Sequence, residues 1–558
     1  MIEEKIKNFL NKAVKELRIE PFDFSIEISK EKDYGDYSSN IAMILAKKEN
    51  KNPLEIASII KEKIKDKIFE KVEVAGPGFI NFFLSDEYLG EELKKVLKEK
   101  KEYGCLKRKK KETVIVDYSG VNIAKPFGIG HLRSTVIGQA IYNMYKCLGY
   151  KVLGDNHIGD WGTQFGKLIY AIKEWGDKKI QDYSVKDLVS LYIKFHEESE
   201  KHPEMINEAR QWFERLEKGD KEARRIWKEC VKTSLKEFDR VYSMLGINID
   251  MTLGESFYEP MLKDVVEEAL EKGVVQKSQG ALIIPLKTLP PLMILKSDGS
   301  TLYSTRDLAA IRHRVKKFKP SLIIYEVGSE QSLHFKQVFE SAELLGWIKK
   351  EKLVHVPHGL IRLKTGKMST RKGEIIFLQD VLEEAVRRAE EIIERKNPDL
   401  KEKKKIAKII GIGAVKYNDL SSHPSTDIIF DWDKILNLEG NSGPYLQYAC
   451  LRAKKILKKS KTKLVLKKIE FTKKEEKNLA RKIQQYPFVL EKAAESFSPN
   501  LISNYLFDLS KEFNSFYENI PVLKAEENKS LRLSLVYSAS LILEKGLEIL
   551  GIEVPEEI

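Results

Sequence analysis

A strand, a glycine-containing loop, a long helix and a second strand follow one another between residues 113 and 160, and this order constrains the fold more than any other feature. TVIVDY at 113–118 has the continuous apolar character of a buried strand, and KVLGDNHIGD at 151–160 predicts a strand followed by a turn. Apolar residues between them repeat at helical spacing: Leu132, Val136, Ile137, Ala140, Ile141, Met144 and Leu148. Gly149 stands where that helix would end. The segment predicts the opening of a doubly wound, Rossmann-type α/β sheet.

The rest of the chain divides into regions of different pattern. Amphipathic helices rich in Glu and Lys are expected at about 170–250, as an insertion. Strand-like runs then resume the α/β alternation at 281–285, 291–295, 321–327 and 353–360, and the pattern beyond about 380 is almost purely helical. The expected domains are an α+β domain at 1–104, a Rossmann-type parallel-sheet domain at 105–380, a helical connective segment at 381–439 and an all-α helix bundle at 440–558.

Charge and composition favour a polyanionic partner. The 558 residues carry a net charge of +13, and 42% of them are hydrophobic, enough for a sizeable core. The stretch from Arg452 to Lys482 is strongly basic, as in a surface that attracts nucleic-acid phosphates, although a solvated helix face has the same composition. The absence of a CxxC pair disfavours a zinc ribbon, and no run of about 18 apolar residues predicts a membrane span. Because MIEEKIKNFL does not resemble a signal peptide, we expect a cytoplasmic protein.

The loop after the first strand of the α/β segment has the features of a nucleotide site. Gly128 and Gly130 let a nucleotide approach the backbone closely. The helix that starts near His131 offers free N–H groups and a positive dipole end to phosphates, and the imidazole can donate a further hydrogen bond. Taken alone, this pattern also suits a tight strand–helix turn.

A second loop, Gly366–Gly373, follows the last predicted strand. It reads GKMSTRKG, so that glycines flank clustered cations. A cationic loop of this kind can close on a triphosphate and stabilise the charge that develops on pyrophosphate. Alone it would be read as a solvated surface loop; two such loops in the two halves of one parallel sheet favour a nucleotide-activating enzyme.

Together the two loops resemble the HIGH and KMSKS signatures of class I aminoacyl-tRNA synthetases. Six further words narrow the resemblance to arginyl-tRNA synthetases: GDWGTQFG (159–166), TLYSTRD (301–307), SEQSLH (329–334), GPYLQYA (443–449), GDYSSNIAM (35–43) and VEVAGPGFINFFLS (72–85). With NIAKPFGIGHLRST and KMSTRKG (367–373), they stand in the family's order along essentially the whole chain.

The resemblance implies activation of L-arginine with ATP, followed by transfer of the arginyl group to the terminal adenosine of its tRNA. A carboxylate must attack the α-phosphorus, so the protein has to supply positive charge and positioning. The implied catalytic residues are His131, Lys125, Lys367, Arg371 and Lys372. The implied ATP-binding residues are Gly128, Gly130, His131, Met368 and Ser369. Mg²⁺ is expected with the triphosphate, and no zinc.

The arginine pocket must recognise a planar guanidinium, which a carboxylate matches with two hydrogen bonds. By motif position Asp307 and Asp117 are the candidate carboxylates, and the Tyr303 hydroxyl could accept a third N–H. Asn122 and Gln331 match family positions that hold the α-amino and carboxylate groups of the substrate. Without the resemblance, a helix cap or a surface ion pair would explain either aspartate.

The same resemblance places tRNA contacts in both terminal domains. The C-terminal bundle resembles the anticodon-binding domain of the family, where Tyr445 and Tyr448, and on motif position alone Tyr517, would stack on unpaired bases. The N-terminal domain resembles the addition that meets the outer corner of the tRNA. A monomer is the family expectation.

Two positions depart from the family's pattern, and two other functions stay open at this point. Gly128 replaces the first histidine of the HIGH-like motif, and Asp117 stands where part of the family has glutamate. A non-catalytic tRNA-binding paralogue would explain Gly128, although His131, Lys125 and the KMSTRKG loop argue against it. Another class I synthetase, such as a cysteinyl or glutaminyl enzyme, does not explain the scattered cysteines or the two aspartates.

Overall fold

The computed structural model of the chain describes residues 2–20, 22–29, 31–106, 108, 111–363, 366–367, 376–460, 464, 466, 469–525 and 527–557. The chain forms two compact units, each built from separate stretches of sequence. One consists of Met1–Leu106, Leu438–Glu548 and Glu553–Ile558, and the other of Lys107–Asn437 and Ile549–Ile552. None of the described helices is long and apolar enough to cross a membrane.

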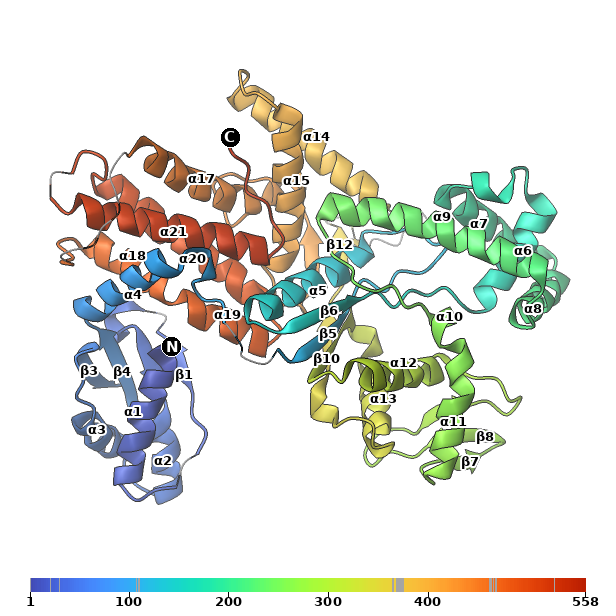
Figure 1. Cartoon of the computed structure of the whole chain (residues 1–558), viewed down its shortest axis with the longest axis horizontal. Coiled ribbons are helices and arrows are strands. Elements are labelled where there is room, and N and C mark those ends of the chain that lie inside the picture. The colour runs from blue at the N-terminus through green and yellow to red at the C-terminus, as the bar shows by residue number, and fades with distance from the viewer. Residues whose placement is uncertain are drawn as a thin grey trace. The chain divides into compact units, whose positions relative to one another are not determined.

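A four-stranded parallel sheet lies at the centre of the unit that contains Lys107–Asn437 (Figure 1). Its strand order is β11 (Leu353–His358), β10 (Leu322–Gly328), β5 (Thr113–Asp117), β6 (Lys151–Asp155), and every neighbouring pair is parallel. Helix α5 (Gly130–Cys147) connects β5 to β6. Order and direction confirm the Rossmann-type sheet expected from residues 113–160.

Close packing of α5 on the sheet depends on one glycine. Residues on most sides of α5 are buried, as expected of a helix covered by a sheet on one face and by other helices elsewhere. A Cβ atom at Gly138 would lie 2.2 Å from the Cβ of Tyr118, so no other residue fits there without moving the helix. On another face of the sheet, a core of apolar side chains joins it to α12 (Tyr303–Phe318) and α13 (Ser332–Leu344): Ile115, Ile323, Leu353, Leu308, Ile311 and Val338.

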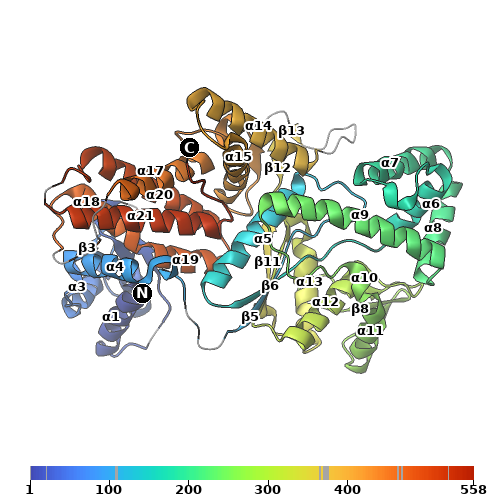
Figure 2. The ribbon, with the colours of Figure 1, turned by 45° about the horizontal axis from the view of Figure 1, so that its top comes forward.

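The insertion between β6 and the rest of the unit is entirely helical, as predicted. It contains α6 (Thr163–Trp175), α7 (Val185–Lys201), α8 (Glu204–Glu217) and α9 (Lys221–Leu245). Figure 2 shows α6, α7 and α8 gathered around one end of the long helix α9. Phe195, Met205 and Ala209 belong to the small core that holds these helices together.

The predicted strands at 281–285 and 291–295 exist, but they do not belong to the parallel sheet. They form β8 (Ala281–Ile284) and β9 (Leu292–Leu295), which pair antiparallel with each other, and β7 (Gln276–Ser278) completes a separate sheet after α10 (Glu255–Tyr258) and α11 (Leu262–Glu271). The prediction that they continue the α/β alternation is therefore wrong. The connection at 285–291 is too short for the crossover that parallel neighbours need, about a dozen residues or more.

Beyond β11 the described chain is mostly helical, with three short strands that the sequence did not reveal. β12 (Ile361–Leu363) pairs antiparallel with β13 (Gly366–Lys367) and parallel with β14 (Ile428–Phe430). The intervening helices are α14 (Leu378–Lys396) and α15 (Lys403–Leu420), and α16 (Trp432–Ile435) follows β14. β14 is too short to show a period, and only its partner β12 makes it a strand.

The other unit combines the two terminal parts of the chain. Residues 2–99 form an antiparallel sheet of order β1-β2-β4-β3 with helices: α1 (Ile2–Glu16), β1 (Ile26–Ile28), β2 (Tyr37–Ser39), α2 (Ile41–Glu49), α3 (Pro53–Lys63), β3 (Phe69–Ala75), β4 (Phe79–Leu84) and α4 (Asp86–Glu99). The C-terminal part is helical throughout its described residues: α17 (Gly443–Lys459), α18 (Lys474–Gln484), α19 (Tyr486–Glu495), α20 (Asn500–Asn519) and α21 (Lys529–Ile549).

Buried polar contacts join the N-terminal sheet to the C-terminal helices. Asp36 is 5% exposed; one carboxylate oxygen accepts a hydrogen bond from Leu84 N–H at 2.7 Å and the other lies 3.2 Å from Arg481 Nε. The Tyr37 hydroxyl donates to Gln484 Oε1 at 3.1 Å, in fully buried surroundings. Because these groups are removed from water on both sides, the two parts form one folded body.

Candidate active site

A cavity of about 750 Å³ opens at the carboxyl ends of three strands of the parallel sheet. Asp117, Gly328 and His358, the last residues of β5, β10 and β11, all line it. Ligands of open α/β sheets bind at this edge, where the strand order reverses. Here the order runs outward from β5 to β6 on one side and to β10 on the other, so the cavity lies at that switch point.

The cavity brings together most of the residues predicted around the first loop, but not all of the arginine-binding candidates. Its lining includes Asp117, Lys125, Gly128, Gly130, His131 and Gln331. Asn122, Tyr303 and Asp307 are not part of this lining. Lys367 is described only through its backbone in β13, and Met368, Ser369, Arg371 and Lys372 lie outside the described residues.

Residues that follow the second signature loop are bonded to the backbone of the first. Ile129 N–H donates to the carbonyl of Ile376 at 3.1 Å, and Leu378 N–H donates to the carbonyl of Phe127 at 2.8 Å. The segment immediately after the KMSTRKG loop is therefore bonded to the loop that carries Gly128 and His131. This is the proximity that a shared nucleotide site requires.

His131 is held as a neutral imidazole at the start of α5. Its ring packs edge-on against Phe127, and its Nδ1 is buried without a hydrogen-bond partner among the described residues. Burial lowers the pKa of His131 below its usual value, so the ring is uncharged at neutral pH. A neutral imidazole still carries one N–H, which suits a hydrogen bond to a ligand oxygen.

Gly128 adopts a backbone conformation open to other residues. Its φ is not in the left-handed region, and its N–H bonds to the carbonyl of Pro126 at 2.8 Å. The replacement of the first HIGH histidine therefore does not follow from a backbone that only glycine can adopt.

Asp117 already has a guanidinium partner inside the protein. Arg314 Nη2 lies 2.6 Å from one Asp117 oxygen and 2.8 Å from a carboxylate oxygen of Asp155, and the arginine side chain is completely buried. One guanidinium is thus shared by two carboxylates and cannot neutralise both. That Asp117 binds the substrate guanidinium stays a prediction, and Asp117 lines the cavity.

A second cluster of acidic side chains surrounds Asp307 on α12. Asp307 Oδ2 is 2.6 Å from His334 Nε2, and the Tyr303 ring lies 4.8 Å from the His334 ring. Glu255, at the start of α10, is close enough to Asp307 and Asp160 for their charges to repel, and burial raises its pKa to about 7. Carboxylates gathered in this way are what a substrate cation requires.

Sequence reasoning missed Glu255. The residue follows Gly254 at the start of a four-residue helix, where an acidic side chain is ordinary. Only its tertiary neighbourhood distinguishes it, and no pattern in the sequence carries that information.

Asn122 and the GDWGTQFG word interact directly. Ile123 N–H donates to the carbonyl of Gly159 and Gly159 N–H to the carbonyl of Val121, both at 3.1 Å. A Cβ atom at Gly159 would lie 2.1 Å from Asn122 Oδ1, so this glycine makes room for the amide. Trp161 and Phe165 are buried.

Three predicted tRNA-binding tyrosines lie on α17 and α20 around one arginine. Tyr448 and Tyr517 are 45% and 41% exposed, and the Arg452 guanidinium lies 4.9 Å and 5.4 Å from their ring centres. Asn514 donates to the Tyr445 hydroxyl at 2.9 Å and accepts from Arg452 Nη1 at 2.9 Å. Exposed aromatic rings beside a cation are suited to stacking with unpaired bases.

Sequence profiles of known families match nearly the whole chain. The profile of the class I (R) tRNA synthetase catalytic domain matches residues 92–432, the DALR anticodon binding domain matches 446–558, and the arginyl tRNA synthetase N terminal domain matches 1–84. An arginine–tRNA ligase of Halothermothrix orenii is 45% identical, with 100% of this chain and 99% of the relative aligned. One of Clostridioides difficile is 41% identical, with 99% of each aligned.

Solved structures agree with these matches. Arginyl-tRNA synthetase of Plasmodium falciparum superimposes with a TM-score of 0.88 at 28% identity, covering 100% of this chain and 99% of that one. The enzyme of Thermus thermophilus gives a TM-score of 0.88 at 26% identity, with both chains covered completely. The chain therefore belongs to the arginyl-tRNA synthetase family.

Proposed function

We propose that this arginine–tRNA ligase activates L-arginine with ATP in the cavity at the end of β5, β10 and β11, and then transfers the arginyl group to the 3′-terminal adenosine of tRNA(Arg). The observation that supports this assignment is the backbone bonding of the first signature loop to the residues that follow the second, Ile129 to Ile376 and Leu378 to Phe127, at the edge of this cavity. This bonding is compatible with both loops contacting the same nucleotide.

Activation joins the substrate carboxylate to the α-phosphorus and releases pyrophosphate. Both reactants are anions, so positive charge and hydrogen-bond donors lower the barrier more than proton transfer does. We assign this role to Lys125, His131 and the cations Lys367, Arg371 and Lys372. Gly128 and Gly130, with Met368 and Ser369, would form the walls that approach the nucleotide.

Mg²⁺ is the ion expected to accompany the triphosphate, where it shields the charge that repels the incoming carboxylate. It binds mainly to phosphate oxygens and keeps several of its waters. Among the carboxylates that line the cavity, Asp117 is paired with Arg314 and Glu326 with His358. The remaining one, Glu330, is exposed and suits a hydrated ion.

For arginine, we assign the guanidinium to the Asp307 side of the site. Asp307 provides a carboxylate, Tyr303 a hydroxyl, and Glu255 a second carboxylate at a pH where it is ionised. Asp117 and Gln331 line the cavity at the reacting end, where the α-amino and carboxylate groups must lie, and Asn122 stands beside that end on the loop after β5.

For tRNA, we assign the anticodon loop to Tyr445, Tyr448 and Tyr517 on the C-terminal bundle. The N-terminal domain would meet another part of the same molecule. A cytoplasmic monomer that needs no zinc completes the proposal.

Arginine attachment to total tRNA tests the proposed function, and ATP–pyrophosphate exchange tests the order of events. We expect arginine alone among the amino acids to be attached. Exchange should be near background without tRNA and rise when tRNA is added, as in other arginyl-tRNA synthetases. Absence of arginylation would contradict the function, and strong exchange by the protein alone would contradict the requirement for tRNA.

A further inference from the structure

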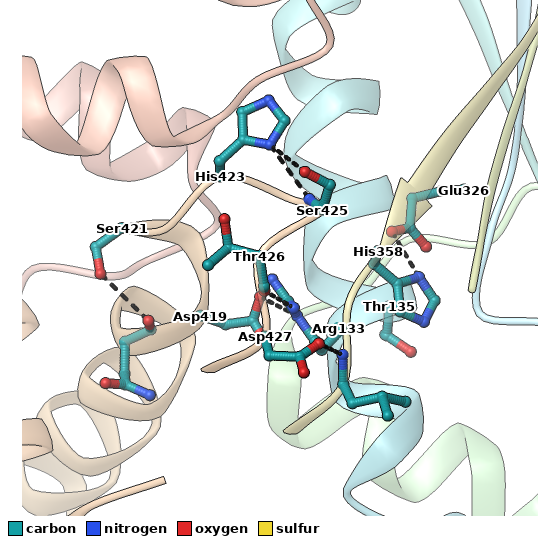
Figure 3. Close-up of polar contacts among 12 residues, drawn as sticks. Arg133, Thr135, Glu326, His358, Asp419, Ser421, His423, Ser425, Thr426 and Asp427 are labelled. Atoms are coloured by element: carbon teal, nitrogen blue, oxygen red, sulfur yellow. Dashed lines mark hydrogen bonds and ion pairs between the residues drawn. The ribbon is translucent and has the colours of Figure 1, made fainter. Parts of the chain in front are cut away.

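The ion pair of Glu326 and His358 lies inside the nucleotide cavity and has no role in the activity described so far. Glu326 is on β10 with a side chain that is 0% exposed, and His358 ends the neighbouring strand β11 with 13% of its side chain exposed. Their atoms Oε1 and Nδ1 are 3.0 Å apart (Figure 3). Both residues line the cavity.

A buried carboxylate of this kind needs a cation. An isolated charge in such surroundings would be very unfavourable, so Glu326 either takes up a proton or holds a positive partner. Its second oxygen, Oε2, is buried and has no hydrogen-bond partner within the described part of the chain. Hence the imidazole of His358 is the group that compensates Glu326.

The charged and titratable groups around His358 come from four elements. Glu326 on β10 and Asp419 on α15 favour the protonated imidazole, whereas Arg133 and His131 on α5 and His355 on β11 itself oppose it. Burial also opposes protonation, but the attraction of Glu326 outweighs it and raises the pKa of His358 above its usual value. His358 is therefore more readily protonated than a free imidazole, whereas the neighbouring His131 is less so.

The surroundings of the pair fix it in place. Arg133 is completely buried; its Nη1 donates to the carbonyl of Thr426 at 2.6 Å and its Nε lies 3.3 Å from Asp419 Oδ1 (Figure 3). Two residues after His358, Leu360 N–H donates to Asp427 Oδ1 at 2.8 Å. His358 thus stands at a rigid point between β11 and the segment that leads to β12.

One nitrogen of His358 remains for a ligand. Nδ1 is bonded to Glu326, and no described residue bonds to Nε2. The same cavity lining contains Gly128, where the HIGH-like motif lacks its first histidine. The cavity therefore has an imidazole on β11 and none at the position where the motif would supply one.

We propose that His358 is a further ATP-binding residue of this enzyme: its imidazole, held by the positioning residue Glu326, gives the nucleotide the histidine contact that Gly128 cannot make. The proposal rests on the proposed function, because it deepens the description of the same site. The group that His358 binds is an anionic oxygen of the nucleotide.

The test compares ATP affinity in the full-length wild type and in H358Q, with arginine and tRNA saturating. The glutamine keeps an N–H donor but removes the charge. We expect the KM for ATP to rise about ten- to a hundred-fold, the range for losing one charge-assisted hydrogen bond, while the KM for arginine stays within about two-fold. H355Q is the matched control, since His355 lies on the same strand, does not line the cavity and should leave both constants unchanged.

The pH profile separates a charged ligand contact from a merely structural pair. Since the pKa of His358 is raised, the wild type should lose ATP affinity as the pH rises through that value. In E326Q the carboxylate is gone and burial dominates, so the loss should occur at lower pH. In H358Q this limb should disappear, while the titration of ATP itself remains common to all variants.

Rescue tests the link to the missing motif histidine. Adding G128H to H358Q should recover at least about ten-fold in the KM for ATP if the two positions serve the same nucleotide. If H358Q fails to fold because Glu326 is left unpaired, the double variant E326Q/H358Q replaces the ion pair with two amides and should show the same loss.

Two outcomes would overturn the inference: an unchanged KM for ATP in H358Q, or a pH profile that is the same in wild type, E326Q and H358Q. Failure of the proposed function looks different. In that case the wild type itself would not attach arginine to tRNA, whatever its histidine variants do.

Discussion

In the proposed arginine site, recognition of the substrate depends most on Asp307. It keeps its place through His334, 2.6 Å away, and its side chain is 21% exposed, so it is available to a ligand. We predict that Asp307→Asn lowers kcat/KM for arginine. The lost transition-state stabilisation should be at least about 3 kcal/mol, as when one partner of a buried ion pair is removed. Steady-state arginylation measures this change.

The neutral analogue citrulline distinguishes charge recognition from shape. In Asp307→Asn it should lose most of its disadvantage against arginine, because discrimination is a difference of two affinities. Asp264→Asn is the control and should behave as wild type, since it removes an exposed carboxylate on α11 that pairs with Arg312 on α12. Near-normal charging of arginine by the Asp307 variant would contradict the assignment.

As a member of the proposed arginine site, Glu255 should make arginine binding depend on pH. Because burial raises the pKa of Glu255 to about 7, its carboxylate is protonated at lower pH and gains its charge only as the pH rises through that value. We predict that the KM for arginine falls between about pH 6 and pH 8. Glu255→Gln should remove this fall, whereas Glu271→Gln, at the exposed end of α11, should preserve it. A pH-independent KM in the wild type would exclude Glu255 from the site.

At the scale of elements, the segment between β11 and β12 is packed tightly against the residues that precede β14. A Cβ atom at Gly359 would lie 2.7 Å from Asp427 Oδ1 and 2.8 Å from the backbone of Thr426 and of Asp427. Backbone atoms on this side cannot move without breaking the Arg133 contacts shown in Figure 3. The segment between β11 and β12 is therefore packed against the residues that lead into β14, and an added side-chain atom would clash with them.

We predict that Gly359→Ala destabilises the protein by about 1–3 kcal/mol, as expected when extra atoms enter a tightly packed region. The displaced strand should also weaken ATP binding more than arginine binding. Thermal unfolding together with the two KM values measures both effects. An alanine variant with wild-type stability would show that β14 can yield.

The elements that the sequence predicted correctly are those whose pattern is local and long. β5, α5 and β6 follow from a buried apolar run, a helical period and Gly149, which has a φ of +80°. β8 and β9 were found but assigned to the wrong sheet, because the choice of partner strand is a tertiary property. β14 was missed for the same reason.

The candidate site follows the same division. Gly128, His131 and Gln331 line the cavity, and short sequence motifs were enough to predict them as site residues. The partner of Asp117, Arg314, lies 197 positions along the chain, and the pair of Glu326 and His358 is 32 positions apart. No spacing rule connects such residues, so only the folded sheet could reveal them.

At the scale of a whole unit, Arg452 joins two exposed rings into one surface. Tyr448 on α17 and Tyr517 on α20 both contact its guanidinium. We predict that Tyr448→Ala weakens tRNA(Arg) binding by about 1–3 kcal/mol, the cost of losing one stacked base. Arg452→Ala should have a larger effect, since it removes a cation and loosens both rings.

Direct binding at several salt concentrations measures these losses. The salt dependence should be steep for the wild type and less steep for Arg452→Ala, because of the two substitutions only this one removes a cation that releases counterions. An unrelated tRNA is the control. Equal weakening for both tRNAs in Tyr448→Ala would make Tyr448 a packing residue of the bundle.

The shared burial of Asp36 with Arg481, and of Tyr37 with Gln484, has a consequence for how the protein is made. The N-terminal sheet leaves the ribosome first, but the residues that cover Asp36 and Tyr37 are synthesised only after the whole parallel-sheet unit. During most of translation the nascent chain therefore exposes a surface meant for the interior. The first domain to be synthesised is therefore completed last. A chain whose synthesis stops before α18 has an N-terminal domain without the helices that cover Asp36 and Tyr37.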